Sequence, residues 1–406
     1  MNWQIMQLGD IASLSLGKML DARKNRGTSQ PYLANVNVRW GAFDLSDLRE
    51  MRFEEDERER FSVRRGDIVM CEGGEPGRCA IWQSDEPIMF QKALHRIRAC
   101  DGVDARFLYY SLLDVGGQDK FSVLFTGSTI KHLPKEKLRL LPVAIPAKAV
   151  QERIADCLSA YDDLFERNRR RMALLERAAR ELYQEWFVRL RFPGYEHAHT
   201  ERGIPVGWRE FPLRTITTKI GSGSTPRGGE ASYTSEGVAL IRSQNVYDYR
   251  FDVSGLAHLR QEQADALISA SVEPNDTLVN ITGASVARCC MVPLSVLPAR
   301  VNQHVMIVRP NRELVDPHYL QKCLASDRHK RQLLSFAQKG STREALTKEI
   351  MANYSILVPS REVMSVFGAR LALFEEQRDA LDRQNQHLLT ARNLLLPRLM
   401  RGEMLT

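Results

Sequence analysis

Several familiar signals are missing from this chain of 406 residues. Its seven cysteines form no Cys-x-x-Cys pair, so neither a disulfide framework nor a zinc site is indicated, and we expect buried, reduced thiols. No apolar run approaches the roughly 18 residues that a membrane-spanning helix needs, and the chain starts in a structured-looking segment rather than in a charged and then apolar leader. We therefore expect a cytoplasmic protein.

Signatures of catalysis are missing as well. The sequence contains no Asn/Asp-Pro-Pro-aromatic motif of amino-methylating enzymes, no phosphate loop that ends in Gly-Lys-Ser/Thr, no His-Glu-x-x-His and no Pro-Asp dipeptide of the common nuclease core. Their absence lowers the odds of an active site. We expect neither catalytic residues nor metal ligands in this chain.

Composition narrows the class of protein but does not identify a binding partner. A net charge of +7 and a pI near 9.0 suit a polyanionic partner, although many basic proteins bind none. A hydrophobic share of 43% and a charged share of 26% are typical of globular domains, and the length allows two or three of them. These numbers exclude a disordered or collagen-like chain.

The strongest pattern is a long helical segment at residues 151–191, which contains no glycine or proline. Its seam positions follow alternating steps of four and three residues, as in a coiled coil; they are Ile154, Leu158, Tyr161, Phe165, Asn168, Met172, Leu175, Ala179, Leu182 and Trp186. At about 1.5 Å per residue this seam spans roughly 50 Å. A helix so long and so charged needs a partner.

The predicted partner has the same stepping 213 residues further along the chain. Its seam positions are Phe367, Leu371, Phe374, Arg378, Leu381, Asn385, Leu388, Arg392, Leu395 and Leu399. Pro397 is expected to end or kink this helix early, which puts its last layer in doubt. One such helix is commonly just a bundle helix, but two in matching register predict a coiled coil.

The long helices belong to a larger duplication. Asn37-Val38 recurs as Asn245-Val246, and Gly127-Ser128-Thr129 recurs as Gly340-Ser341-Thr342, at offsets of 208 and 213. Short runs rich in valine and isoleucine, broken by glycine and proline, predict irregular β-rich modules, each with one amphipathic helix near 107–113 or 319–334.

We therefore predict an α+β protein with two similar β-rich domains, joined by two long helices that form an antiparallel coiled coil. The predicted parts are a first module at residues 1–146, a central helix at 147–191, a linker with the second module at 192–359, and a C-terminal helix at 360–402.

The repeated Gly-Ser-Thr turns are embedded in cations. Lys131 and His132 follow the first turn, Lys339 precedes the second and Arg343 follows it. Small residues permit close approach, hydroxyls and backbone amides bind phosphate, and long cations reach base edges. These turns therefore predict DNA contacts, although a plain tight turn before a strand is about equally open.

Other candidates for DNA contact are arginines and amides, which supply the bidentate pairs that discriminate guanine and adenine, and cations in a loop-like stretch suited to phosphate. The full set of predicted DNA-binding residues is Arg23, Lys24, Arg39, Gly127, Ser128, Thr129, Lys131, His132, Arg242, Ser243, Gln244, Asn245, Lys339, Gly340, Ser341, Thr342 and Arg343.

The order of module, helix, module and helix resembles the specificity subunit of type I restriction-modification systems, over essentially the whole chain. The resemblance is carried by Trp3 with Leu8-Gly9-Asp10-Ile11, Ser222-Gly223-Ser224-Thr225-Pro226, both Gly-Ser-Thr turns, Asn302-Gln303-His304-Val305, and the helix entries after Pro146 and Pro359. It implies that each module is a target-recognition domain for one half of a bipartite, asymmetric sequence in double-stranded DNA, and that the helices are the conserved spacer.

The resemblance also implies partners and cofactors. It implies that the chain does no chemistry and binds no cofactor itself. It recruits two adenine methyltransferase subunits, which use S-adenosylmethionine, and two motor-nuclease restriction subunits, which use ATP and Mg.

The two seams predict their own register. If the modules sit at opposite ends, the helices run antiparallel, and a register in which facing residue numbers sum to 553 pairs Asn168 with Asn385, Ile154 with Leu399 and Trp186 with Phe367. A buried asparagine layer would fix register and orientation. The alternative is that both asparagines tilt into solvent.

Apolar residues are left over beside the seam. They are Val366, Leu373, Ala380 and Leu394 on the second helix, and Leu164, Leu174 and Phe187 on the first. We expect these rows to receive helices of the methyltransferase subunits. Burial against the chain's own modules is the alternative.

Two other functions stay open at this point. A self-contained, sequence-specific DNA methyltransferase or nuclease with an unrecognised active site would turn over without any partner. A structural coiled-coil adaptor would show no salt-dependent binding to duplex DNA.

Overall fold

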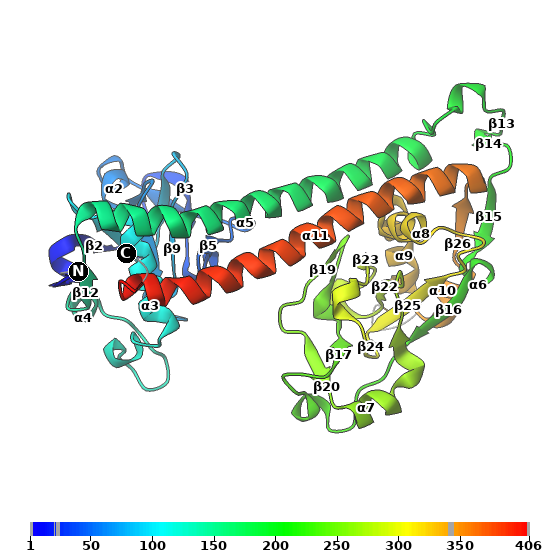
Figure 1. Ribbon diagram of the computed structural model, residues 1–406. Coiled ribbons are helices and arrows are strands. Elements are labelled where there is room, and N and C mark those ends of the chain that lie inside the picture. The colour runs from blue at the N-terminus through cyan, green and yellow to red at the C-terminus, as the bar shows by residue number, and fades with distance from the viewer. Residues whose placement is uncertain (1–2, 20, 22–24, 340–344, 404–406) are drawn as a thin grey trace. The chain divides into compact units, whose positions relative to one another are not determined.

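The computed structural model describes residues 3–19, 21, 25–339 and 345–403, and it divides the chain into two compact units (Figure 1). Unit 1 comprises Met1–Asn168 and Arg383–Thr406, and unit 2 comprises Arg169–Asp382. Each unit holds one β-rich module and one part of each long helix. The long helices are α5 (Lys148–Tyr183), which continues into a π-helical turn (Gln184–Val188), and α11 (Arg361–Met400). The predicted α+β class with two long helices is confirmed.

The module of unit 1 is built on two four-stranded sheets. The first is antiparallel, in the order β2 (Ala12–Leu16), β11 (Leu94–Ala99), β8 (Ile68–Cys71) and β9 (Cys79–Ile81). The second has the order β6 (Arg49–Phe53), β3 (Thr28–Leu33), β10 (Ile88–Phe90) and β7 (Ser62–Val63), in which β3 and β10 are parallel. Two further pairs are β1 (Gln4–Gln7) with β12 (Pro142–Ile145), and β4 (Val38–Arg39) with β5 (Ala42–Phe43). The helices are α1 (Leu8–Ile11), α2 (Glu55–Arg60), α3 (Ala105–Gly117) and α4 (Lys135–Arg139).

The module of unit 2 repeats this topology strand for strand. Its first sheet has the order β16 (Thr217–Ser222), β25 (Val305–Pro310), β22 (Thr277–Asn280) and β23 (Cys289–Met291). Its second has the order β20 (Ala257–Leu259), β17 (Val238–Ile241), β24 (Ala299–Val301) and β21 (Ser271–Val272), again with its middle pair parallel. The remaining pairs are β15 (Arg209–Pro212) with β26 (Ser355–Val358), β18 (Val246–Tyr247) with β19 (Arg250–Phe251), and β13 (Thr200–Glu201) with β14 (Ile204–Pro205). The helices are α6 (Leu213–Ile216), α7 (Gln261–Ala266), α8 (Pro317–Ala325), α9 (Asp327–Lys339) and α10 (Lys348–Asn353).

A buried ion pair stands at the same place in both modules. Arg98 of β11 donates two hydrogen bonds to Asp67, at 2.6 and 2.7 Å, and Arg309 of β25 donates two to Asp276, at 2.8 and 2.9 Å. Both aspartates are almost fully buried, so each needs these bidentate partners. The duplication therefore includes this side-chain ion pair as well as the order of the strands.

The long helices complete the hydrophobic core of each module. In unit 1, Ile154 and Leu158 of α5 and Leu399 of α11 lie in one cluster with Phe107 of α3. In unit 2, Trp186, Phe367 and Leu371 lie in one cluster with Tyr319 of α8. Neither module could bury this apolar surface without the helices.

The two helices are antiparallel within each unit. In unit 1, Asn168 Nδ2 donates to Asn385 Oδ1 at 2.9 Å, and both asparagines are only 5% exposed. In unit 2, the rings of Trp186 and Phe367 lie 5.8 Å apart. Both contacts have the predicted register, so the asparagine layer is confirmed and tilting into solvent is excluded.

Some sequence predictions fail in detail. Pro397 does not end α11, which runs to Met400, and Leu399 stays buried. A proline removes one helical hydrogen bond, but this one lies in the last turn, where burial of Leu396 and Leu399 holds the chain. The helix expected at 319–334 is split at Ser326 into α8 and α9.

Two further expectations change. Cys100 and Cys157 are exposed rather than buried, while the other five thiols are buried. The linker is anchored at both ends, because Phe192 and Trp208 lie in the core of unit 2. Within the described ranges, no helix is long and apolar enough to cross a membrane.

Candidate nucleic-acid interface

Three loops meet on the module of unit 1. The first, residues 72–78, joins β8 to β9; the second is residues 126–132; the third is residues 34–44, with the β4–β5 hairpin. Gly73 of the first loop forms a β-bridge with His132 of the second, and Arg78 of the first donates to the Asn35 carbonyl of the third at 2.9 Å. The first loop therefore holds the other two together.

The 126–132 loop is closed by its own backbone. Thr126 and His132 exchange two hydrogen bonds, at 2.9 and 2.8 Å. Gly127 has a φ of +91°, and a Cβ atom there would lie 2.1 Å from the Ile130 carbonyl oxygen, so glycine is required. The predicted residues Gly127, Ser128, Thr129, Lys131 and His132 thus share one exposed loop.

The positively charged side chains on and near this loop differ in how strongly neighbouring groups hold them. The His132 ring lies 3.2 Å from both carboxylate oxygens of Glu72, which restrains it. Lys131 is exposed, and its Nζ atom lies 5.9 Å from the centroid of the Phe125 ring. Arg39, at the end of β4, is also exposed and lies 3.6 Å from Asp44. Among the predicted DNA-binding cations of this module that the structure describes, Lys131 and Arg39 are exposed and accessible to an incoming anion.

In the module of unit 2, the described residues show corresponding contacts between loops. Thr282, in the loop that joins β22 to β23, forms a β-bridge with Ala345, and Asn280 at its root donates to the carbonyls of Ser243 at 2.9 Å and Val246 at 3.2 Å. The predicted residues Arg23, Lys24, Gly340, Ser341, Thr342 and Arg343 lie outside the described part of the chain. Lys339 is the last residue of α9.

Burial overturns one candidate. Asn245 is fully buried; its Oδ1 accepts from the Arg242 backbone N–H at 3.0 Å, and its Nδ2 donates to the Asp252 carbonyl at 2.9 Å. Asn37 makes the equivalent bonds in unit 1. Asn245 therefore caps a turn and has no amide group left to offer a base. The prediction that Asn245 contacts DNA is wrong.

Some side chains next to Asn245 already make contacts within their own module. Arg242 is 18% exposed, lies over the Tyr233 ring and donates to the Gly255 carbonyl at 2.7 Å. Ser243 is half-buried, whereas Gln244 is exposed and makes one long hydrogen bond, 3.4 Å, to Gly255. Gln244 is the most available side chain of this turn.

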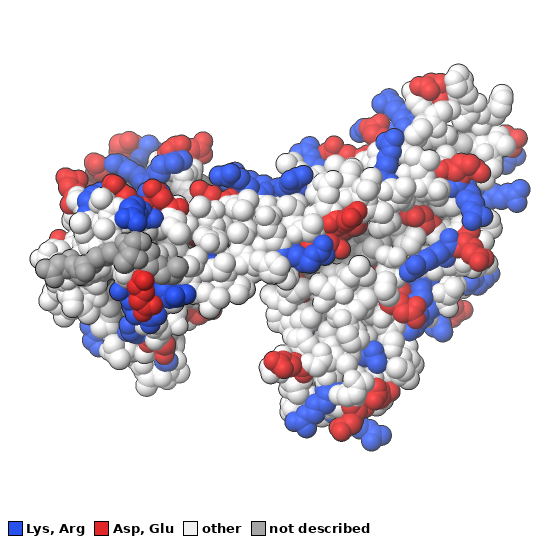
Figure 2. Space-filling view, in the orientation of Figure 1, with Lys and Arg blue, Asp and Glu red and all other residues white. Residues whose placement is uncertain are grey.

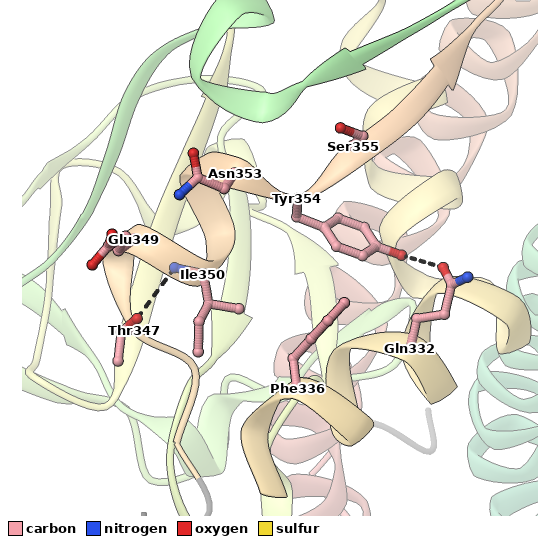
Figure 3. Close-up of a pocket in the computed structure, with 8 residues that line it drawn as sticks. All are labelled: Gln332, Phe336, Thr347, Glu349, Ile350, Asn353, Tyr354 and Ser355. Carbon is pink, nitrogen blue, oxygen red and sulfur yellow. Dashed lines mark hydrogen bonds between the residues drawn. The ribbon is translucent and has the colours of Figure 1, made fainter. Parts of the chain in front are cut away.

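A pocket of about 550 Å³ lies beside the residues that flank 340–344 in unit 2 (Figure 3). Phe336 comes from α9 and Thr347 caps α10, while the Tyr354 hydroxyl contacts Gln332 at 2.7 Å and His329 at 2.6 Å. Burial lowers the pKa of His329 to about 4, so the ring is neutral at pH 7. No sequence motif marks this pocket, because its lining comes from three separate elements.

One face of the modules carries charges of both signs. On the face that Figure 2 shows, Lys and Arg side chains are interspersed with Asp and Glu on both modules. Specific loop side chains, rather than net charge, must therefore select a partner there. Among the described residues, no group of three or more His, Cys, Asp or Glu side chains is placed to hold a metal ion.

The leftover apolar rows of the helices are mostly exposed. Leu174, Val366, Leu373 and Leu394 expose 45–66% of their surface, Ala380 is exposed and Leu164 is half-buried. Phe187 departs from the prediction: it is 9% exposed and packs against Trp208, Tyr319 and Phe367. For Phe187 the alternative, burial against the chain's own module, is correct.

The duplicated modules, their convergent loops and the antiparallel helices define a two-module recognition protein. Residues 1–177 match the family model described as type I restriction modification DNA specificity domain. Over nearly its whole length, the chain is similar to specificity subunits of type I restriction enzymes.

Two named relatives and one solved structure show how far this similarity extends. The type I restriction enzyme MjaIX specificity subunit of Methanocaldococcus jannaschii is 23% identical, over 99% of this chain and 94% of that protein. The HindI specificity subunit of Haemophilus influenzae is 20% identical, over 73% of this chain and 77% of that one. The crystal structure of a type I S subunit from M. genitalium has the same fold, with a TM-score of 0.56, 16% identity and coverage of 98% and 96%.

Proposed function

We propose that the chain reads a bipartite, asymmetric site in double-stranded DNA in the cytoplasm, with one module for each half-site. The observation that carries this proposal is that the described loops of the two modules share a backbone arrangement but carry different side chains at equivalent positions. Arg39 ends β4 in unit 1, whereas Tyr247 ends β18, the equivalent strand of unit 2. Because base edges are distinguished by the side chains that reach them, diverged loops on one scaffold should read different sequences.

Lys131 provides the test of DNA contact. Lys131→Ala should weaken binding to duplex DNA about 3- to 10-fold, because one cation near phosphate is lost, and it should lower the salt slope by about 1. Lys148→Ala, an exposed lysine at the start of α5, is the matched control. Titration of the assembled complex against labelled DNA at several salt concentrations measures both effects. Equal affinities for the two variants would make the 126–132 loop a plain turn.

We propose that the exposed row of α11, together with exposed Leu174 and half-buried Leu164 of α5, receives two methyltransferase subunits. Soluble proteins rarely leave apolar residues exposed at heptad spacing without a partner. The complex would also include two restriction subunits. Under this proposal S-adenosylmethionine, ATP and Mg are bound by the partners, and the chain itself needs no cofactor.

Leu373 tests the partner surface. Leu373→Glu should reduce co-purification of the methyltransferase at least 10-fold, since it places a charge in an apolar contact. Ala372→Glu adds the same charge at the adjacent exposed position, which points about 100° away on the helix, and should assemble normally. Intact assembly of the Leu373 variant would refute the docking surface.

A further inference from the structure

A cluster of two arginines and a tyrosine distinguishes the module of unit 2. Tyr247 belongs to β18 and Arg250 to β19, while Arg288 ends the loop that joins β22 to β23. The guanidinium carbons of Arg250 and Arg288 lie over the Tyr247 ring, 4.7 and 4.8 Å from its centroid. Two of the three converging loops thus meet at one aromatic ring.

The arginines of this cluster are poorly neutralised. Arg250 is 63% exposed and lies 3.8 Å from Asp252, whose other oxygen already accepts from the backbone N–H and hydroxyl of Ser254. Arg288 has no carboxylate oxygen within 4 Å among the described residues. The nearby Asp248 is bound by Lys330 of α9. Two like charges held over one ring, with one long ion pair between them and an acid, leave hydrogen-bonding capacity for an acceptor from outside.

The backbone of these loops has the same conformation at equivalent positions of the two modules. Tyr249 and Ala287 have left-handed φ values of 61° and 62°, and the equivalent residues of unit 1 are Gly41 at 76° and Gly77 at 91°. The N–H of Gly41 donates to Cys79 at 3.0 Å, and that of Tyr249 donates to Cys289 at 2.9 Å. A non-glycine residue in this region costs about 1–2 kcal/mol, so the path is retained in unit 2 despite that cost.

The side chains on this shared path differ between the modules. Arg39 stands where unit 2 has Tyr247, and Ala42 stands where it has Arg250. Arg78 is equivalent to Arg288, but it is 8% exposed and donates to the Asn35 carbonyl. Among the described residues, a ring with two cations over it, exposed Arg250 and half-buried Arg288, is therefore present in unit 2 and absent from the equivalent positions of unit 1.

We propose that Arg288 and Arg250 read guanine in the half-site of the second module, with Tyr247 as the platform that orients them. This proposal rests on the proposed function. A guanidinium stacked on a ring keeps its N–H edge free, and that edge matches the O6 and N7 acceptors of guanine in the major groove. A phosphate oxygen is the other acceptor with this chemistry, and the experiment separates the two.

The test uses the full-length chain assembled with its methyltransferase partner. Methylated adenines are mapped across the DNA of the expressing cells for the wild-type complex and for Arg288→Gln, Arg250→Gln and Tyr247→Ala. Arg288→Lys keeps the charge but loses the bidentate edge, and it covers the case in which the glutamine variant fails to fold. Arg312→Gln, an exposed arginine of the same module that donates to the Pro274 carbonyl, is the control.

Arg288→Gln and Arg288→Lys should relax one guanine position in one half-site, with discrimination reduced roughly 5- to 150-fold. The other half-site and the control variant should stay strict. Weaker methylation at all sites with unchanged base preference, together with a salt slope lower by about 1, would assign the arginine to phosphate and overturn the proposal. Unchanged affinity and specificity would also overturn it. If the wild-type complex methylates no bipartite sequence, the proposed function fails instead.

Discussion

Replacement of Asn168 by leucine tests the layer that sets the register of the long helices. Asn168 Nδ2 donates to Asn385 Oδ1 at 2.9 Å and to Gln384 Oε1 at 3.0 Å, and the Asn385 side chain is 5% exposed. Asn168→Leu leaves the Asn385 amide buried without this partner, which costs about 1–3 kcal/mol. Unit 1 has roughly 190 residues, so its melting temperature should fall by about 2–4 °C per kcal/mol.

The double variant Asn168→Leu with Asn385→Leu should recover most of that loss, because no buried amide remains unpaired. Two ion pairs also oppose a slipped register: Arg392 donates to Asp162 at 2.6 Å in unit 1, and Arg378 donates to Glu176 at 3.0 Å in unit 2. We therefore expect the double variant to keep its register.

Urea unfolding of the full chain, followed by circular dichroism, measures these differences. Gln377→Leu, at an exposed position of α11, is the control for added apolar surface. Two results would refute the reasoning: a loss of unfolding free energy below about 0.5 kcal/mol in the single variant, or a loss in the double variant equal to the sum of the two single losses. Two residues that share a buried hydrogen bond must show a coupling energy in such a cycle.

Two further predictions concern unit 2. Glu176→Gln should cost about 3 kcal/mol in urea unfolding, because Glu176 accepts from Lys322, which is 3% exposed, and from Arg378. A change under 1 kcal/mol would mean that the Tyr249 ring beneath Lys322 and the Glu375 carboxylate beside Arg378 stabilise the two cations without Glu176. The pKa of His329 falls from its ordinary value of 6.5 to about 4 because burial disfavours the charged ring. The unfolded chain then binds more protons below pH 6.5, so stability that is present above this pH is lost as the pH falls towards 4. His329→Gln should flatten the profile between these values, and an unchanged profile would assign the loss to other groups.

The sequence by itself determined the architecture, because its signals are periodic and repeated. The four-three spacing needs no knowledge of contacts, and the offset of 213 residues aligns two seams that meet at Asn168 and Asn385. It also located the 126–132 loop, since its Gly-Ser-Thr turn and cations are contiguous.

Only the tertiary structure decided which side chains are free. Asn245 and Gln244 are neighbours with the same functional group, yet burial commits the first to a turn and leaves the second exposed. Phe187 follows the apolar spacing of the first long helix, yet its side chain is buried in the core of unit 2. Arg288 and Tyr247 are 41 positions apart in the sequence and belong to different loops. Their contact depends on how two sheets bring their loops together, and local patterns carry no information about that.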